Sequence, residues 1–213
     1  MLAALNGVRR DRSGATAAEF ALVLPLLLLL LFGIIDAGRF LYETNRAEKA
    51  TQMGARFAIV TNVIPAGLVN EDYTNSANCD DDNNGTYEAC QTGSDIRNPA
   101  ALGLLTCSSG SCTCTTSPCP SNVTIPAASF TNLVNRMKAM RPDIAAANVR
   151  VEFRGSGIGF AGDPTGMDLV PLVTVRLVGM QFRPIALFGG VAFNLPAFAT
   201  TLSAEDSAGT QAN

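Results

Sequence analysis

The sequence predicts an α+β protein, in which a long N-terminal transmembrane helix precedes a small domain with one helix packed on an antiparallel sheet and a disulfide-rich loop. Three observations support this class. No residue from Phe20 to Ile35 is charged, all six cysteines lie between Cys79 and Cys119, and segments of alternating polarity follow Ala127. A chain of 213 residues has room for one membrane segment and one ordinary domain.

The composition argues against several classes of function. The net charge is −3 and the basic residues are scattered, so we expect no nucleic-acid binding. Histidine is absent, which removes the commonest general base and the commonest metal ligand. A Ser-His-Asp or Cys-His active site therefore cannot be built within this chain, and we expect that it is not an enzyme.

The N-terminal apolar run is nearly long enough to cross a membrane. Residues 20–35 make about 24 Å of helix, whereas a bilayer has a hydrocarbon core of about 30 Å. The small residues before it and Ala37–Gly38 after it supply the missing length, but they place the Glu19 carboxylate at membrane depth, which costs about 2–3 kcal/mol. The basic residues that precede the run predict a cytoplasmic N-terminus, with everything after Arg39 outside: Arg9, Arg10 and Arg12.

Three interpretations of this segment compete. A cleaved secretory signal fits the basic start and the Leu-rich centre, but Ile35-Asp36-Ala37 is a poor small-x-small cleavage site. A plain single-pass anchor fits the length and leaves Glu19 unexplained. A prepilin leader explains more. A short basic stretch ends in Gly14, four small residues follow, and Glu19-Phe20 then opens an apolar helix that contains Pro25.

In this pattern the stretch "GATAAEFALVLPLLLLLLFGIIDAGRFLY" resembles the TadE-like pseudopilins of tight-adherence (Flp-type) pilus systems, and "PLVTVRLVG" and "FATTLSAEDSAG" resemble the family's C-terminal part more weakly. The resemblance implies a minor pilin-like subunit that supports assembly of a type IV pilus in bacteria. It implies that a prepilin peptidase cuts between Gly14 and Ala15. It also implies that Glu19, which precedes Phe20, pairs with the new N-terminus of a neighbouring subunit.

The same resemblance implies the partners and the location. They are the prepilin peptidase, other pilin-like subunits, an inner-membrane pilus assembly platform with its ATPase, and the lipid bilayer. The expected location is the bacterial inner membrane, crossed once, with a cytoplasmic N-terminus and a periplasmic C-terminal domain. The alternative function is a membrane-anchored periplasmic binding or adhesion module that is not processed as a pilin.

The helix is expected to continue past the membrane. Small and aromatic residues recur at three- to four-residue steps, which predicts one helix over residues 15–60, broken near Pro65: Phe40, Ala47, Ala50, Gly54 and Phe57. We expect this stripe to pack on the chain's own domain, and packing within a filament is the alternative. Asp36 and Arg39 are three residues apart, so we expect an ion pair that marks the membrane boundary.

These observations divide the chain into five parts. They are a prepilin-type leader (1–14), a transmembrane and extended spine helix (15–60), a Cys-rich loop region (61–126), a periplasmic α+β domain (127–204) and a C-terminal tail (205–213).

The cysteines predict disulfide bonds, because an even, clustered set beyond a membrane segment is typical of an oxidising compartment. A Cys79–Cys90 bond and bonds within the second cluster close short loops, although spacing does not select among 15 pairings of the six residues. The second cluster is Cys107, Cys112, Cys114 and Cys119. A zinc site is the alternative, but this C-x4-C-x-C-x4-C pattern lacks the usual C-x2-C clamps.

The segment "CDDDNNGTYEAC" resembles the first half of a calcium loop. Asp80, Asp82 and Asn84 supply oxygens at alternating positions before Gly85. The twelfth position is Gln91 rather than a bidentate Glu, and Glu88 could substitute for it. We prefer a solvated Asp/Asn turn and expect no cofactor, with a calcium site as the alternative.

The sequence from Ala127 onward predicts the α+β domain. Apolar residues at helical spacing start at Phe130 and stop before Pro142, while "NVRVEFRG", "PLVTVRLVG" and "PAFATTLS" alternate as half-buried strands do. The segment "GSGIGFAGDPTG" has Phe160 where a phosphate-binding loop needs its third glycine, so we expect a long, mobile connection. The apolar "RPIALFGGVAFNLP" is too short and interrupted to span a membrane, and we expect it to cover the sheet. Exposure as a docking patch for a partner or the lipid surface is the alternative.

Overall fold

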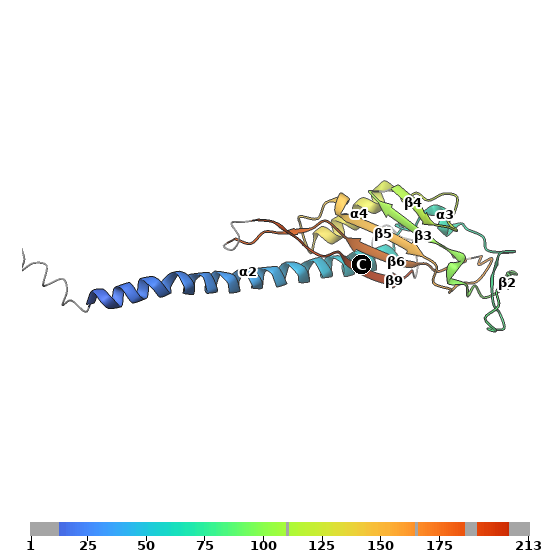
Figure 1. Ribbon diagram of the computed structural model, residues 1–213. Helices are drawn as coiled ribbons and strands as arrows, with labels where there is room; N and C mark the ends of the chain where they lie inside the picture. Colours follow the sequence, from blue (N-terminus) through green and yellow to red (C-terminus); the bar gives the residue numbers. More distant parts are fainter. Residues whose placement is uncertain (1–12, 110, 165, 186–190, 205–213) are drawn as a thin grey trace, which may run out of the picture. The chain divides into compact units, whose positions relative to one another are not determined.

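The computed structural model of the chain describes residues 13–109, 111–164, 166–185 and 191–204 (Figure 1). The chain divides into two compact units. The first consists of Met1–Glu43 and Gln181–Phe193, and the second of Thr44–Met180 and Asn194–Asn213. A long apolar helix followed by a small antiparallel sheet with disulfide bonds confirms the predicted α+β class.

Helix α2 runs from Ser13 to Ile59 and contributes to both units. In the second unit its inward stripe is made of small residues with no exposed surface: Ala47, Ala50, Ala55 and Ala58. The Thr51 hydroxyl lies 3.0 Å from the Thr200 hydroxyl of the sheet's last strand. This part of the stripe therefore packs on the chain's own domain, as expected. Phe40, the first member of the expected stripe, belongs to the other unit.

The second unit is built on a five-stranded antiparallel sheet with the order β4-β3-β5-β6-β9 (Figure 1). Its strands are β3 (Leu104–Ser108), β4 (Ser111–Thr116), β5 (Val149–Arg154), β6 (Leu172–Leu177) and β9 (Phe198–Ser203). The last three are the strands that alternation predicted. Val151 lies opposite Val175 on β6 and opposite Cys107 on β3, so one apolar row crosses the centre of the sheet.

One face of the sheet forms the core. The inward side chains of β5 and β6 are fully buried: Val149, Val151, Phe153, Val173, Val175 and Leu177. Helix α4 (Ala127–Lys138) buries Phe130, Leu133, Val134 and Met137, as its spacing predicted. A Cβ added at Gly54 would lie 3.0 Å from Met137 and 3.1 Å from Val175, so α2, α4 and β6 meet at this glycine.

The opposite face of the sheet is polar. The Arg176 guanidinium donates to both carboxylate oxygens of Glu152, at 2.9 and 3.0 Å. Thr174 and Thr201 lie 2.8 Å apart through their hydroxyls on the neighbouring strands. A sheet with one apolar and one polar face is the usual antiparallel arrangement in which one side meets water.

The Cys-rich region is more ordered than its composition predicts. The expectation of a loop throughout residues 61–126 is wrong for β3 and β4, which join the main sheet. The remaining elements are short: α3 (Ala66–Val69), β1 (Ala77–Cys79), β2 (Glu88–Ala89), η1 (Pro99–Ala101) and, before β5, η2 (Ala146–Asn148). Strands β1 and β2 form a small sheet of their own.

Most of the apolar segment after β6 belongs to the first unit, whereas the five-stranded sheet belongs to the second. Strands β7 (Gln181–Phe182) and β8 (Phe193–Asn194) pair with each other, and residues 181–193 belong to the unit that contains the N-terminal half of α2. The expected covering role is therefore wrong for Ile185, Val191 and Phe193, whose side chains are exposed. Three predicted features lie outside the described residues: residues 1–12 of the leader, the Gly189-Gly190 break and the tail 205–213.

Candidate functional site

The predicted cleavage and pairing residues lie in the first turns of α2. The helix begins at Ser13, so Gly14, Ala15, Glu19 and Phe20 are all helical. Gly14 and Glu19 are exposed, as is the ring of Phe20. Positions 15 and 19 are four residues apart and so lie on one face of the helix.

Gly14 has no packing role among the described residues. No neighbouring atom lies within 4 Å of the place where a Cβ would stand, and its φ is not in the left-handed region. A glycine within a helix costs about 1 kcal/mol relative to alanine. Neither the packing nor the backbone conformation of this helix therefore requires glycine here.

The apolar part of α2 is exposed around its circumference. Leu22, Leu26 and Leu30 are 80%, 75% and 64% exposed, and their neighbours in the run are similar. Among the described residues one helix is long and apolar enough to cross a membrane, with a mean hydropathy of 2.6 in its best window. Apolar surface of this extent in a helix indicates a lipid environment. Pro25 removes the bond to the Ala21 carbonyl, which membrane helices tolerate.

Glu19 is the only charged residue in the described part of α2 before Asp36. Its carboxylate makes no hydrogen bond or ion pair with any other described residue. A carboxylate at membrane depth costs about 2.5–3.5 kcal/mol near the helix centre and less near an interface. Among the residues that the structure describes, Glu19 therefore makes no stabilising contact that would offset this cost.

Asp36 lies at the other end of the apolar run, and its carboxylate makes a second contact in addition to the expected ion pair with Arg39. The Asp36–Arg39 pair is present, with 3.5 Å between Oδ1 and Nη1. Asp36 is also buried, at 4% exposed, and accepts a hydrogen bond from the Ile185 backbone N–H at 2.9 Å. Sequence spacing gave no sign of this second contact, which joins residues 149 positions apart.

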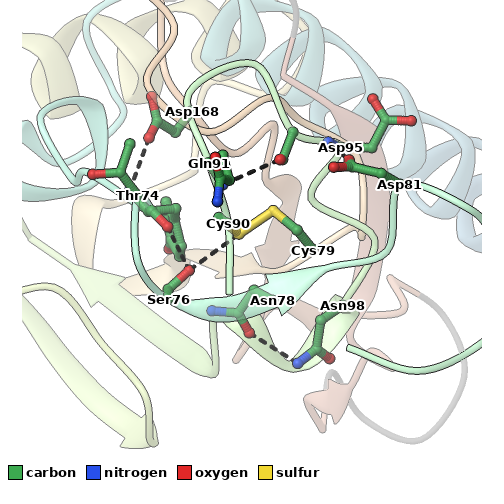
Figure 2. The surroundings of a disulfide bond; sticks show 12 residues. Thr74, Ser76, Asn78, Cys79, Asp81, Cys90, Gln91, Asp95, Asn98 and Asp168 are labelled. Carbon is green, nitrogen blue, oxygen red and sulfur yellow. Dashed lines mark hydrogen bonds between the residues drawn. A yellow bond between two sulfur atoms is a disulfide. The ribbon is translucent and has the colours of Figure 1, made fainter. Parts of the chain in front are cut away.

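The six cysteines form three disulfide bonds: Cys79–Cys90, Cys107–Cys112 and Cys114–Cys119. Since all six are oxidised, the structure has no thiolate for the alternative zinc site. Figure 2 shows the Cys79–Cys90 bond with the Ser76 hydroxyl 3.4 Å from the Cys90 sulfur. Beside it the Asn98 amide donates to the Asn78 side chain at 2.9 Å (Figure 2).

The stretch from Asp80 to Gly85 forms a turn held by its own side chains. The two oxygens of the buried Asp80 carboxylate accept backbone N–H bonds from Asn84 and Gly85, each at 2.9 Å. Burial raises the pKa of Asp80, but these two bonds, the hydrogen bond with Asp82 and the charge of Arg97 together outweigh it, so the net pKa lies below its usual value. The Asn84 amide donates to Asp82, and Glu88 lies in β2. Within the described residues, no three His, Cys, Asp or Glu side chains converge in a way that could hold a metal ion.

The glycine-rich connection between β5 and β6 is held by hydrogen bonds to the carboxylate of Asp168, a residue that the sequence pattern did not single out. Asp168 is 5% exposed and accepts backbone N–H bonds from Tyr73, Gly162 and Asp163, at 2.8, 2.8 and 2.9 Å. In Figure 2 Asp168 lies beside the Thr74 segment that follows Tyr73. The connection also bonds to residues 93–96 through backbone groups, and Gly159 pairs with Leu169. It is therefore tied at several points, unlike the mobile connection that its glycines predicted.

The comparisons with known proteins bear on the N-terminal helix alone. Residues 14–56 match the family model described as TadE-like protein. No curated protein and no solved structure matches the chain. The matched segment starts at Gly14, contains Glu19 and the whole apolar run, and ends within the buried part of α2. The N-terminal helix is therefore similar to that of TadE-like proteins over these residues, and this similarity supports a connection with tight-adherence pilus systems.

Proposed function

We propose that the chain is a minor pilin-like subunit, a pseudopilin, that supports assembly of a tight-adherence type IV pilus from the bacterial inner membrane. One observation carries the proposal. Glu19 is an exposed carboxylate without a partner among the described residues, and it stands five residues after Gly14 at the head of an exposed apolar helix. The family match over residues 14–56 supports the connection with pilus machinery.

The proposal gives Gly14 a role in recognition by another protein. A prepilin peptidase cuts between Gly14 and Ala15, and a narrow cleavage site requires a residue without a side chain. The packing around Gly14 supports this, because the fold would accommodate a larger residue there. Cleavage removes the leader and leaves a free ammonium on Ala15.

The same proposal gives Glu19 a partner. The ammonium of Ala15 on one subunit pairs with the Glu19 carboxylate of the next, in surroundings of low dielectric constant. The attraction between two charges at contact distance is several times stronger there than in water. It offsets much of the cost of holding each charge in lipid, and neither charge is stable there alone.

The remaining parts have supporting roles. Arg9, Arg10 and Arg12 keep the leader in the cytoplasm, where the assembly platform and its ATPase act, and the disulfide-bonded domain lies in the periplasm. Other pilin-like subunits pack around α2. The chain performs no reaction of its own in this scheme, since the catalytic groups belong to the peptidase.

Cleavage is tested by intact-mass measurement of the chain extracted from its host membrane. We expect a mature N-terminus at Ala15 in cells with the prepilin peptidase, and the full chain in cells without it. Gly14→Val should leave the chain uncut even when the peptidase is present. An intact Met1 in peptidase-positive cells would refute the pilin assignment and favour a membrane-anchored binding or adhesion module.

The pairing is tested by Glu19→Ala. We expect normal insertion and normal cleavage, but a loss of pili of at least about tenfold, because breaking a buried charge pair costs roughly 3–5 kcal/mol. The matched control is Glu48→Ala, which removes an exposed carboxylate from the same helix beyond the apolar run. Electron-microscopic counts of pili per cell are the measurement. Equal counts for Glu19→Ala and wild type would show that assembly does not depend on this pairing.

A further inference from the structure

The segment after β6 packs against α2 where the apolar run ends. We define the interfacial arm as the described residues 181–185 and 191–193, all of which belong to the same unit as the N-terminal half of α2. The Ile185 N–H donates to the buried Asp36 carboxylate at 2.9 Å. The rings of Phe40 and Phe182 meet edge to face with centroids 5.4 Å apart, and the Arg39 guanidinium lies 5.6 Å from the Phe182 centroid.

These contacts fix the level of the arm along the helix. Asp36 directly follows Ile35, the last residue of the uncharged run, and it lies 17 residues beyond Glu19. That separation corresponds to about 25 Å at about 1.5 Å per residue. With Glu19 near one boundary of a hydrocarbon core of about 30 Å, Asp36 and the arm lie near the other.

The outward surface of the arm is apolar apart from Gln181 and Arg183, which are also exposed. Ile185, Val191 and Phe193 are 72%, 59% and 43% exposed. Between the arm and α2 lies an open hollow of about 500 Å³, whose walls include Gly33, Ala37, Leu41 and Pro184. No residue from Pro184 to Phe193 is charged. An apolar surface of this kind would be costly in water and is favoured at a lipid surface.

Two further features favour lipid over a protein partner. The exposed side chains of Phe193 on the arm and Leu41 on α2 line the same hollow, so the apolar surface of the arm continues onto the helix in this unit. Arg39 and the exposed Arg183 flank it, and the Arg39 guanidinium donates to the Arg183 carbonyl at 3.4 Å. Long basic side chains at a membrane boundary place their charge among the lipid phosphates.

We propose that the interfacial arm is a second membrane-contacting element, which inserts Ile185, Val191 and Phe193 into the outer boundary of the bilayer that α2 crosses. Asp36 is the positioning residue, because its carboxylate holds the arm's backbone on the helix at that depth. The arm gives the chain two contacts with the membrane instead of one. This inference depends on α2 crossing the membrane and is independent of whether the chain is processed as a pilin.

The absence of tryptophan from the sequence makes a direct test available. A single tryptophan is introduced into the full chain by Ile185→Trp, and separately by Val191→Trp. Each protein is reconstituted into phosphatidylcholine–phosphatidylglycerol vesicles whose acyl chains carry bromine at defined depths. Ile158→Trp is the matched control, because Ile158 is the same residue type and is 58% exposed in the other unit. Leu30→Trp gives the reference for the hydrocarbon interior.

We expect bromine near the head groups to quench the tryptophans of Ile185→Trp and Val191→Trp at least threefold more strongly than that of Ile158→Trp, and Leu30→Trp to be quenched best by deeper bromine. Quenching at the level of Ile158→Trp with emission typical of water would overturn the proposal, because the arm would then be in solvent. Blue-shifted emission without quenching would also overturn it, because a second copy of the chain would then cover the arm. Agreement between the two arm variants excludes a local effect of either substitution.

Discussion

At the residue scale, this chain uses buried carboxylates to fix backbone that has no regular structure. Asp168 binds three N–H groups from two separate segments, and Asp80 binds two within one turn. Asp36 does the same for the interfacial arm. The donors are half-buried or exposed except for the Tyr73 N–H, which is buried and would cost about 1–3 kcal/mol if it were left without a partner.

Asp168→Ala tests this principle in the glycine-rich connection. Three backbone donors lose their acceptor at a site that is 5% exposed, so we expect the free energy of unfolding to fall by about 3 kcal/mol or more. Asp82→Ala is the control, since Asp82 is exposed and its carboxylate accepts from the exposed Asn84 amide, so its loss should cost less than about 0.5 kcal/mol. Denaturant unfolding of the two proteins gives the comparison. Equal stabilities would mean that the connection is held by other contacts.

The buried phenol of Tyr73 allows the packing around Asp168 to be tested at alkaline pH. Burial, followed by the charges of Glu71 and Asp168, raises the pKa of Tyr73 to about 12. An unfolded tyrosine ionises near pH 10, so the stability that depends on the neutral phenol is complete below about pH 10 and is lost as the pH rises towards about 12. The loss should reach roughly 2 kcal/mol. Ultraviolet titration of the phenolates should show a late step that Tyr73→Phe removes, and a titration without such a step would contradict the burial of this side chain.

At the element scale, the fold depends on α2 lying very close to the sheet. Its fully buried residues there are alanines, and Gly54 faces Met137 of α4 and Val175 of β6. Small residues allow the helix backbone to approach, so that two helices share one sheet face. Larger side chains at these positions would force the layers apart, because protein interiors are packed as densely as organic crystals.

Gly54→Val should therefore be strongly destabilising. Its first added carbon would lie about 3 Å from both Met137 and Val175, and overpacking of this kind typically costs about 1–3 kcal/mol. Gly38→Val is the matched control, because the same addition on the same helix meets no atom within 4 Å. Thermal unfolding of the domain followed by circular dichroism gives the two values. A Gly54→Val protein as stable as the control would show that α2 does not pack as closely as described.

The elements also show where sequence patterns succeed. Strands β5, β6 and β9 were predicted because apolar and polar residues alternate, and α4 because Phe130 and Met137 share one face. Strands β3 and β4 were missed because Ser, Thr and Cys dominate them, although Leu105 and Cys107 do alternate inward. Gly14 and Glu19 were predicted as cleavage and pairing residues because their spacing resembles the prepilin pattern. The contact between Asp36 and Ile185 depends on tertiary folding across 149 positions, and local spacing carries no information about it.

At the scale of the whole molecule, the distribution of cysteines and basic residues along the chain implies that the two sides of the membrane differ chemically. All six cysteines follow the apolar run and all are in disulfide bonds, whereas three arginines precede it. By the chain-entropy estimate, each bond that closes a short loop contributes about 2–3 kcal/mol. In the proposed orientation, the domain's stability would depend on its delivery to an oxidising compartment, and the charge asymmetry around α2 would direct that delivery.

The orientation of the chain in the membrane is therefore predicted to decide whether its six cysteines are oxidised or reduced. In its native host the chain should show no thiol that reacts with a maleimide-coupled polymer before reduction, and six after reduction and unfolding. Replacing Arg9, Arg10 and Arg12 with Glu removes the charge that holds the N-terminus inside, so a large fraction of the domain should remain in the cytoplasm with reactive thiols and rapid protease digestion. Gel shifts after labelling measure both states on the same samples. Six reactive thiols in the unaltered chain would place the domain in the cytoplasm and would contradict both the proposed orientation and the role of the disulfide bonds. A fully oxidised triple variant would instead show that the apolar helix orients itself without these charges.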